Sequence, residues 1–210
     1  HWNVWELFLS NNRYRKAIQI DSLKNSHPIE VEVHHPDEIS EIFDMVSYAK
    51  GAAIIRMLAE YLGDDKFRDG LRYYLKKHSY KNTSTIDLWE AFEKISKKPV
   101  GKIMHNWTSQ SGYPVVEVTS HKDTLIFSQS RFFANPNSKL KFKDNTVWQI
   151  PISANETNFL LTKKKEQAEL CSGMTEPIKV NLGETSFHRT AYSHELLMAL
   201  KNPVLEKKLS

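Results

Sequence analysis

The chain has 210 residues, of which 40% are hydrophobic and 26% are charged, and its formal net charge is +4. These values are typical of an ordinary globular protein that is long enough to bury a substantial core. Acidic and basic residues are interspersed, and no nucleic-acid-binding module surrounds the basic runs, so we expect no nucleic-acid partner. The basic residues predicted to be solvated strand and turn positions are Lys139, Lys141, Lys143 and the run 163–165.

The sequence contains one cysteine, Cys171. A single cysteine excludes an internal disulfide framework and suits a reducing compartment, so we expect a cytoplasmic protein. Cys171 lies in the turn-like Cys171-Ser-Gly-Met and is a poor candidate for a catalytic nucleophile. No apolar run approaches the length of a membrane-spanning helix, so we expect no membrane partner, and no secretory signal is visible.

Up to about Gly112, apolar residues recur at helical spacing. The helix after Tyr48 is predicted to bury Ala52, Ile55, Leu58, Ala59 and Leu62, and the helix after Pro99 to bury Val100, Ile103, Met104 and Trp107. Helices are predicted over 12–25, over 37–43, from Tyr48 to a stop at Gly63, from Asp64, after a cap at Thr83 or Ser84, and after Pro99.

From about Val115 to Tyr192, short alternating runs rich in β-branched residues replace the helical pattern. They predict strands over 115–118, 124–132, 147–152, 158–162, 178–181 and 187–192. Their spacing suits a small antiparallel β-sandwich, so the fold class is predicted to be α+β. The predicted domains are 1–112, which is helical, 113–192, which is the sandwich, and 193–210, which is the first helix of a further domain.

Tyr48 lies at the start of its predicted helix, after the acidic residues Asp37, Glu38, Glu41 and Asp44. A tyrosine hydroxyl is protonated at neutral pH and can donate one hydrogen bond, which suits it to stabilise an oxyanion. The alternative is that Tyr48 only packs in a helical core. The acids could attract the ammonium group of a peptide, but for at least three of them we favour placement near a helix N-terminus.

Ser47-Tyr48-Ala49-Lys50-Gly51-Ala52 closely resembles a pattern of the zinc aminopeptidases of the thermolysin-like (gluzincin) type. The family also has segments similar to Asp21-Ser-Leu-Lys-Asn-Ser-His27-Pro28-Ile and Trp107-Thr-Ser-Gln110-Ser-Gly112-Tyr-Pro114, and the chain resembles its archaeal tricorn-interacting factors. The resemblance implies the helical C-terminal part of a thermolysin-like catalytic domain, a β-sandwich and the start of a C-terminal helical domain. It also implies that Tyr48 is a catalytic residue that hydrogen-bonds the oxyanion.

The same resemblance implies an enzyme that removes N-terminal residues from peptides. A larger protease system is a candidate partner. Such enzymes bind zinc through His-Glu-x-x-His and a later glutamate. Here the only His-Glu pair is followed by Met198, a poor zinc ligand, at the fifth position of His194-Glu195-Leu-Leu-Met198. The resemblance thus places the zinc ligands upstream of His1. We therefore expect an internal piece of the enzyme that is inactive by itself, with no metal site and no assigned substrate-binding residue.

Three alternatives stay open at this point, one of which is a free-standing hydrolase with an unrecognised site that is active as this chain alone. His34 and His35, with His27 nearby, could bind a metal, but adjacent residues on an extended strand point in opposite directions, and His27 is better explained as a residue that ties a loop end. The chain could also be a non-catalytic protein-interaction module, in which Tyr48 is only a packing residue.

Overall fold

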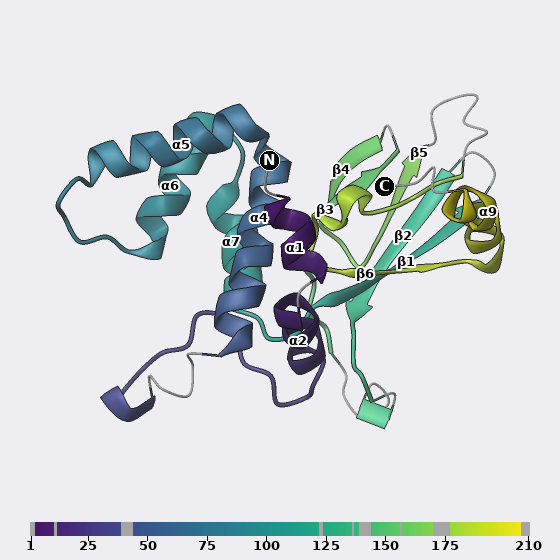
Figure 1. Cartoon of the computed structure of the whole chain (residues 1–210), viewed down its shortest axis with the longest axis horizontal. Helices are drawn as coiled ribbons and strands as arrows, with labels where there is room; N and C mark the ends of the chain where they lie inside the picture. The colour runs from purple at the N-terminus through teal and green to yellow at the C-terminus, as the bar shows by residue number, and fades with distance from the viewer. Residues whose placement is uncertain are drawn as a thin grey trace.

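A computed structural model of the chain describes residues 3–10, 12–38, 44–121, 124–135, 137–138, 144–155, 157–169 and 177–206. Its first half is helical, strands follow, and helix α9 ends the described part (Figure 1). Helices α5 and α6 lie at one end of the molecule and the sheets at the other, with α4 and α7 between them (Figure 1). The α+β class is therefore confirmed.

The helices begin and end largely where local signals place them. Asp87 accepts a hydrogen bond from the backbone N–H of Ser84 at 2.8 Å, which completes a capping box at the start of α6. Gly63, with φ of +83°, ends α4, and Pro99 precedes α7. The helical segments are α1 (Val4–Ser10), α2 (Asn12–Asp21), the 3₁₀ turn η1 (Pro36–Glu38), the π-helical turn η2 (Val46–Lys50), α4 (Gly51–Leu62), α5 (Asp64–Lys77), α6 (Thr85–Ser96), α7 (Val100–Thr108), the 3₁₀ turn η3 (Leu182–Glu184) and α9 (His194–Leu205).

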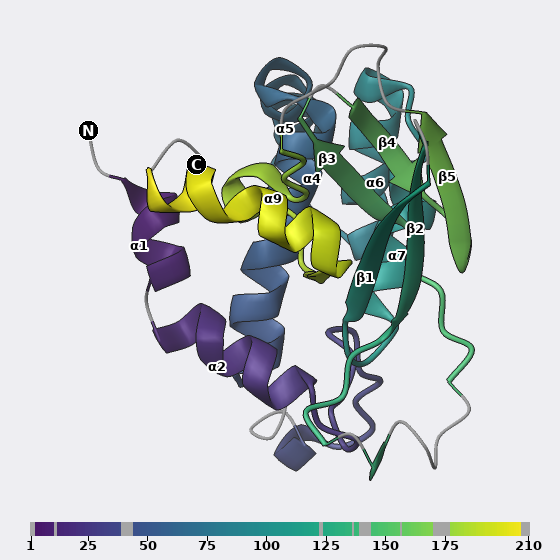
Figure 2. The same ribbon diagram turned by 90° about the vertical axis from the view of Figure 1, so that its right-hand side faces the viewer.

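The strands form a four-stranded sheet in the order β5-β2-β1-β6 and a separate hairpin of β3 and β4. Figure 2 shows the hairpin beside β2 and β5, with α9 crossing near β1. The two sheets contribute their inward-facing apolar residues to one hydrophobic cluster. The strands are β1 (Pro114–His121), β2 (Thr124–Arg131), β3 (Ile150–Ala154), β4 (Thr157–Leu161), β5 (Lys165–Glu169) and β6 (Arg189–Tyr192).

The larger sheet is mixed, whereas the sequence predicted an antiparallel one. β1 pairs antiparallel with β2, but it pairs parallel with β6, which the chain reaches after β5 at the opposite edge of the sheet. The predicted strand 178–181 is reduced to an isolated bridge between Val180 and Ala154. β5 was not predicted, because this exposed edge strand lacks a buried face.

The buried face of α4 agrees with the prediction at Leu58 and Leu62 and differs from it elsewhere. The buried residues are Ala53, Ile54, Met57, Leu58 and Leu62. They lie on the same side of the helix as Lys50, which is itself buried. Because α4 is apolar on nearly all sides, spacing alone could not select this face, and a lysine at its start argued against it. The α7 prediction is confirmed, since Val100, Ile103, Met104 and Trp107 are all buried.

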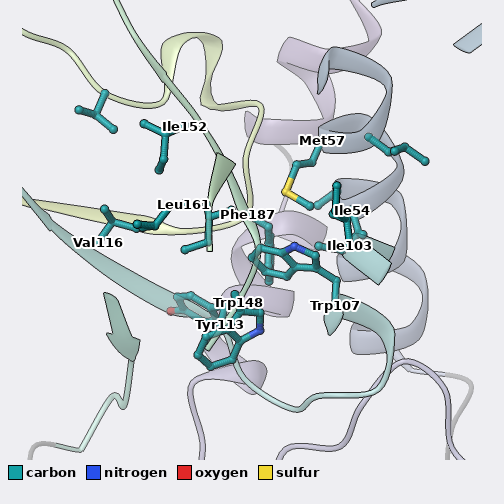
Figure 3. Packing of buried hydrophobic residues seen from close by; sticks show 14 of the residues in the cluster. Ile54, Met57, Ile103, Trp107, Tyr113, Val116, Trp148, Ile152, Leu161 and Phe187 are labelled. Atoms are coloured by element: carbon teal, nitrogen blue, oxygen red, sulfur yellow. The ribbon is translucent and has the colours of Figure 1, made fainter. Parts of the chain in front are cut away.

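One hydrophobic cluster joins the helices to the sheets. Trp107, Trp148, Tyr113 and Phe187 gather between α4 and α7 on one side and the strands on the other (Figure 3). The indole N–H of Trp107 donates to the carbonyl of Gln149 at 2.8 Å, so the polar atom of this buried ring is satisfied. The division into domains at residues 113 and 193 stays a prediction. Within the described ranges, none of the helices combines the length and the apolar character that crossing a membrane requires.

A pair of glycine substitutions tests the packing of α5 on α6. A Cβ on Gly70 would lie 2.5 Å from Cδ1 of Phe92, which is buried and stacked on Phe67. We expect Gly70→Ala to lower the free energy of unfolding by about 1–3 kcal/mol through overpacking. Gly51→Ala is the matched control, because nothing lies within 4 Å of its Cβ, and it should raise that free energy by up to about 1 kcal/mol. Urea unfolding followed by circular dichroism measures both, and a stabilised Gly70→Ala variant would contradict the close contact.

Candidate functional site

A buried ion pair lies directly behind the segment that carries Tyr48. Nζ of Lys50 is 3.0 Å from Oδ2 of Asp21, and both side chains are 0% exposed. Nζ also donates to the carbonyl oxygens of Gln110 at 3.1 Å and Gly112 at 3.0 Å. The ammonium group therefore lies against one charged oxygen and donates hydrogen bonds to two carbonyl oxygens. The pair joins the end of α2, the π-helical turn η2 and the segment after α7.

Asp21 is also held by hydrogen bonds, through its other carboxylate oxygen. Its Oδ1 accepts hydrogen bonds from the backbone N–H of Gly112 at 2.8 Å and from the hydroxyl of Ser26 at 2.5 Å. Burial lowers the pKa of Lys50, and the charge and hydrogen bond of Asp21 oppose that effect. A charge that is removed from water is tolerated only when it is paired and hydrogen-bonded in this way.

Gly112 completes the network through its backbone alone. Its N–H binds Asp21 and its carbonyl binds Lys50, and it holds a positive φ of +82°. A Cβ at this position would collide with the guanidinium of Arg131. The position therefore requires glycine for its conformation and for the close approach of Arg131.

The ion pair determines which way Tyr48 faces. Residues two apart on a helix lie on roughly opposite sides, so a buried Lys50 directs Tyr48 outward. Val46 and Ala49 are also buried, whereas Tyr48 is 61% exposed. The alternative in which Tyr48 packs in a helical core does not fit this exposure. Its catalytic role stays a prediction.

Asp44 caps the turn that carries Tyr48. Its Oδ1 accepts from the backbone N–H groups of Val46 at 2.8 Å and Ser47 at 3.0 Å, and its carbonyl accepts from the N–H of Tyr48 at 3.2 Å. Its Oδ2 lies 3.0 Å from Nε2 of His27. Asp44 therefore acts as a helix N-terminal acid, as the sequence suggested, and His27 ties its loop to that cap.

The other predicted candidates lie elsewhere. His34 and His35 are exposed and lie near Glu32 and Asp37 respectively. Glu38 accepts from the backbone N–H of His34, while Glu41, Cys171, Lys139, Lys141 and Lys143 lie outside the described residues.

Among the described residues, no group of three or more His, Cys, Asp or Glu side chains is placed to hold a metal ion. His194 begins α9 after the cap residue Ser193, and Met198 on the same helix is 49% exposed. The described residues of this chain therefore do not fit a zinc ion of the peptidase type.

Sequence reasoning missed the network behind Tyr48. Asp21, Lys50 and Gly112 each lie in one of the three segments that carry the resemblance, yet nothing in their spacing brings them together. The available signal was a lysine at the start of an otherwise apolar helix face.

A cavity of about 340 Å³ lies between α4 and the β3–β4 hairpin, and its lining residues include neither Tyr48 nor this network.

Removal of both charges should destabilise the protein less than the two single removals added together. We expect Asp21→Asn or Lys50→Met to lower the free energy of unfolding by about 3–5 kcal/mol, because each leaves one buried charge uncompensated. The double variant Asp21→Asn with Lys50→Met should lose less than the sum of the two. Urea unfolding of the four proteins measures this coupling. Arg68→Met, which breaks an exposed pair with Asp65, is the control and should change little. Additive losses would contradict the proposed pairing.

Comparison with known proteins finds a matching family and several similar relatives. The family model described as the peptidase family M1 domain matches residues 1–107. Aminopeptidase M1-C of rice (Oryza sativa subsp. japonica) is 40% identical over 223 residues, which cover 100% of this chain and 25% of the relative. Tricorn protease-interacting factor F2 of Thermoplasma volcanium is 39% identical over 92% of this chain and 24% of its own length. Puromycin-sensitive aminopeptidase of Caenorhabditis elegans is 36% identical over 99% of this chain and 23% of its own length.

The chain thus spans about a quarter of the length of the curated relatives that it matches. The family match covers the helices that precede the strands, as far as Trp107 in α7, together with the Asp21–Lys50 ion pair and the turn that carries Tyr48. On this evidence, the chain belongs to peptidase family M1.

Proposed function

We propose that this chain is part of an aminopeptidase that removes N-terminal residues from peptides, and that Tyr48 stabilises the oxyanion formed during hydrolysis. The observation that carries the proposal is the outward placement of Tyr48 on a turn fixed from behind by the Lys50–Asp21 pair. Membership of peptidase family M1 and relatives named as aminopeptidases support the reaction class.

The chemistry of a tyrosine suits this role. Its hydroxyl donates one hydrogen bond, and a donor aimed at the developing oxyanion stabilises the transition state more than the ground state. Such a donor is effective when the surrounding structure holds it in place before the reaction, so that little reorganisation is needed. The Asp44 cap and the buried Lys50 provide that fixed placement on one short turn.

The zinc of the family must be held by residues other than those described here, since their side chains do not fit it. We propose that these ligands lie in a longer protein that contains this chain, upstream of His1, and that the 210-residue chain alone neither binds catalytic zinc nor hydrolyses peptides. Zinc analysis of the purified 210-residue chain tests whether it binds zinc, without any activity assay. Association with a larger protease system is proposed only from the name of the archaeal relative, and a cytoplasmic location stays a prediction.

Replacement of the Tyr48 hydroxyl tests the central part of this function. In the full-length protein at matched zinc occupancy, Tyr48→Phe should lower kcat by about 10²–10³-fold on aminoacyl p-nitroanilides, with little change in KM. Tyr80→Phe is the matched control, since Tyr80 is fully exposed between α5 and α6, and it should leave kcat unchanged.

The outcomes separate the alternatives. An active full-length protein that does not respond to Tyr48→Phe would remove Tyr48 from the mechanism and leave the family assignment intact. An inactive full-length protein that is correctly folded and loaded with zinc would favour the non-catalytic interaction module.

A further inference from the structure

The cavity of about 340 Å³ between α4 and the β3–β4 hairpin has the size of a site for a small ligand. Pockets that bind small molecules usually measure roughly 300–1,000 Å³ and combine an apolar lining with a few polar groups. The cavity lies at the C-terminal end of α4, where Tyr61 lines it, whereas Tyr48 precedes the start of that helix. At about 1.5 Å per residue, Tyr48 and Tyr61 are about 20 Å apart along the helix axis. The cavity is therefore separate from the turn that carries Tyr48.

Three apolar side chains, which we call the apolar floor, line this cavity: Met57, Ile152 and Phe159. Met57 and Ile152 are buried members of the hydrophobic cluster, and Met57 extends from α4 toward the strands (Figure 3). The ring of Phe159 on β4 is held edge-on against Phe127, with 5.0 Å between the ring centroids. Because these residues are fixed by the core, a ligand group that packs on them gains most if it is apolar.

Lys98 supplies a cation at the same cavity. Its Nζ donates to the carbonyl oxygen of Tyr61 at 2.6 Å and lies 3.8 Å from the centroid of the Tyr61 ring. An ammonium group has three hydrogens, so two remain available. Burial and the neighbouring charge of Lys66 lower the pKa of Lys98, and within the described part of the chain no carboxylate pairs with it. A carboxylate on a ligand would therefore meet an ammonium group that lacks a counter-charge.

Glu60 supplies the opposite charge in this cavity. Its side chain is exposed and makes no hydrogen bond or ion pair with the residues that the structure describes. Glu60 lies on α4 and Lys98 between α6 and α7, so two opposite charges line one cavity without pairing with each other. The side-chain amide of Asn158 on β4 also lacks a hydrogen-bond partner among those residues, and it can donate to a carboxylate. A molecule that carries both an ammonium and a carboxylate group matches this arrangement.

We propose that the cavity binds a free α-amino acid with an apolar side chain. The ammonium group of the amino acid pairs with Glu60, its carboxylate binds Lys98 and Asn158, and its side chain packs on the apolar floor. The proposal goes beyond the function proposed above and does not depend on it, because none of these residues belongs to the turn that carries Tyr48.

Methyl NMR of the full-length protein tests this binding at the cavity itself. The methyl signal of isotope-labelled Met57, assigned by its loss in Met57→Leu, should shift on addition of L-leucine and saturate with a Kd of about 1 mM or below. N-acetyl-L-leucine lacks the ammonium group and isopentylamine lacks the carboxylate, so each should bind about 10-fold more weakly or worse. If either compound binds as tightly as L-leucine, the proposed pairing of both charges is wrong.

Glu60→Gln separates the direct contact from an effect transmitted from elsewhere. The change removes the charge at an exposed position and nearly preserves the shape of the side chain, so the fold should be retained. It should weaken L-leucine about 10-fold and leave N-acetyl-L-leucine unchanged, because that compound has no ammonium group. Glu90→Gln, at an exposed position on α6 outside the cavity, is the matched control and should bind like the wild type. A Met57 signal that ignores L-leucine, or L-leucine binding that ignores Glu60→Gln, would overturn the inference.

Discussion

The ion pair between Lys50 and Asp21 is the interaction on which the arrangement of this chain depends. It removes two charges from water, and such a pair is retained only if both partners are held by further hydrogen bonds. Gly112 supplies two of these from its backbone, which forces the chain after α7 back against the end of α2. A single requirement, the satisfaction of a buried ammonium group, thereby brings together segments about 60 and 90 residues apart along the chain.

The orientation of Tyr48 follows from this pair and from the core. The helical positions that begin with Lys50 continue into Ile54, Met57 and Leu58, which belong to the hydrophobic cluster shared with the sheets. Rotation of the turn η2 would therefore withdraw a buried charge from its partners and displace a packed helix. Tyr48 is thus held outward by the rigid part of the structure, which is what a preorganised hydrogen-bond donor requires.

Local chemistry in the sequence predicted much of the fold. The stop at Gly63, the cap at Ser84 and the buried residues of α7 depend on neighbouring residues, and all three agree with the structure. The buried face of α4 could be predicted only in part, at Leu58 and Leu62, because the rest depends on a lysine whose partner lies 29 residues earlier in the chain. The contact between His27 and Asp44 is likewise set by tertiary folding. Tyr48 was found through its surrounding motif, since an exposed tyrosine carries no functional signal of its own.

A double-mutant cycle between the Lys50–Asp21 ion pair, removed as a unit, and Tyr48 tests most directly whether the ion pair acts on catalysis through the tyrosine. The measurement is kcat of the full-length protein carrying Asp21→Asn with Lys50→Met, Tyr48→Phe, or all three changes, at a temperature where each remains folded. If the ion pair positions Tyr48, its removal should lower kcat in the presence of the tyrosine hydroxyl and have little further effect in its absence. Losses that multiply independently would show that the ion pair only stabilises the fold and would contradict the account.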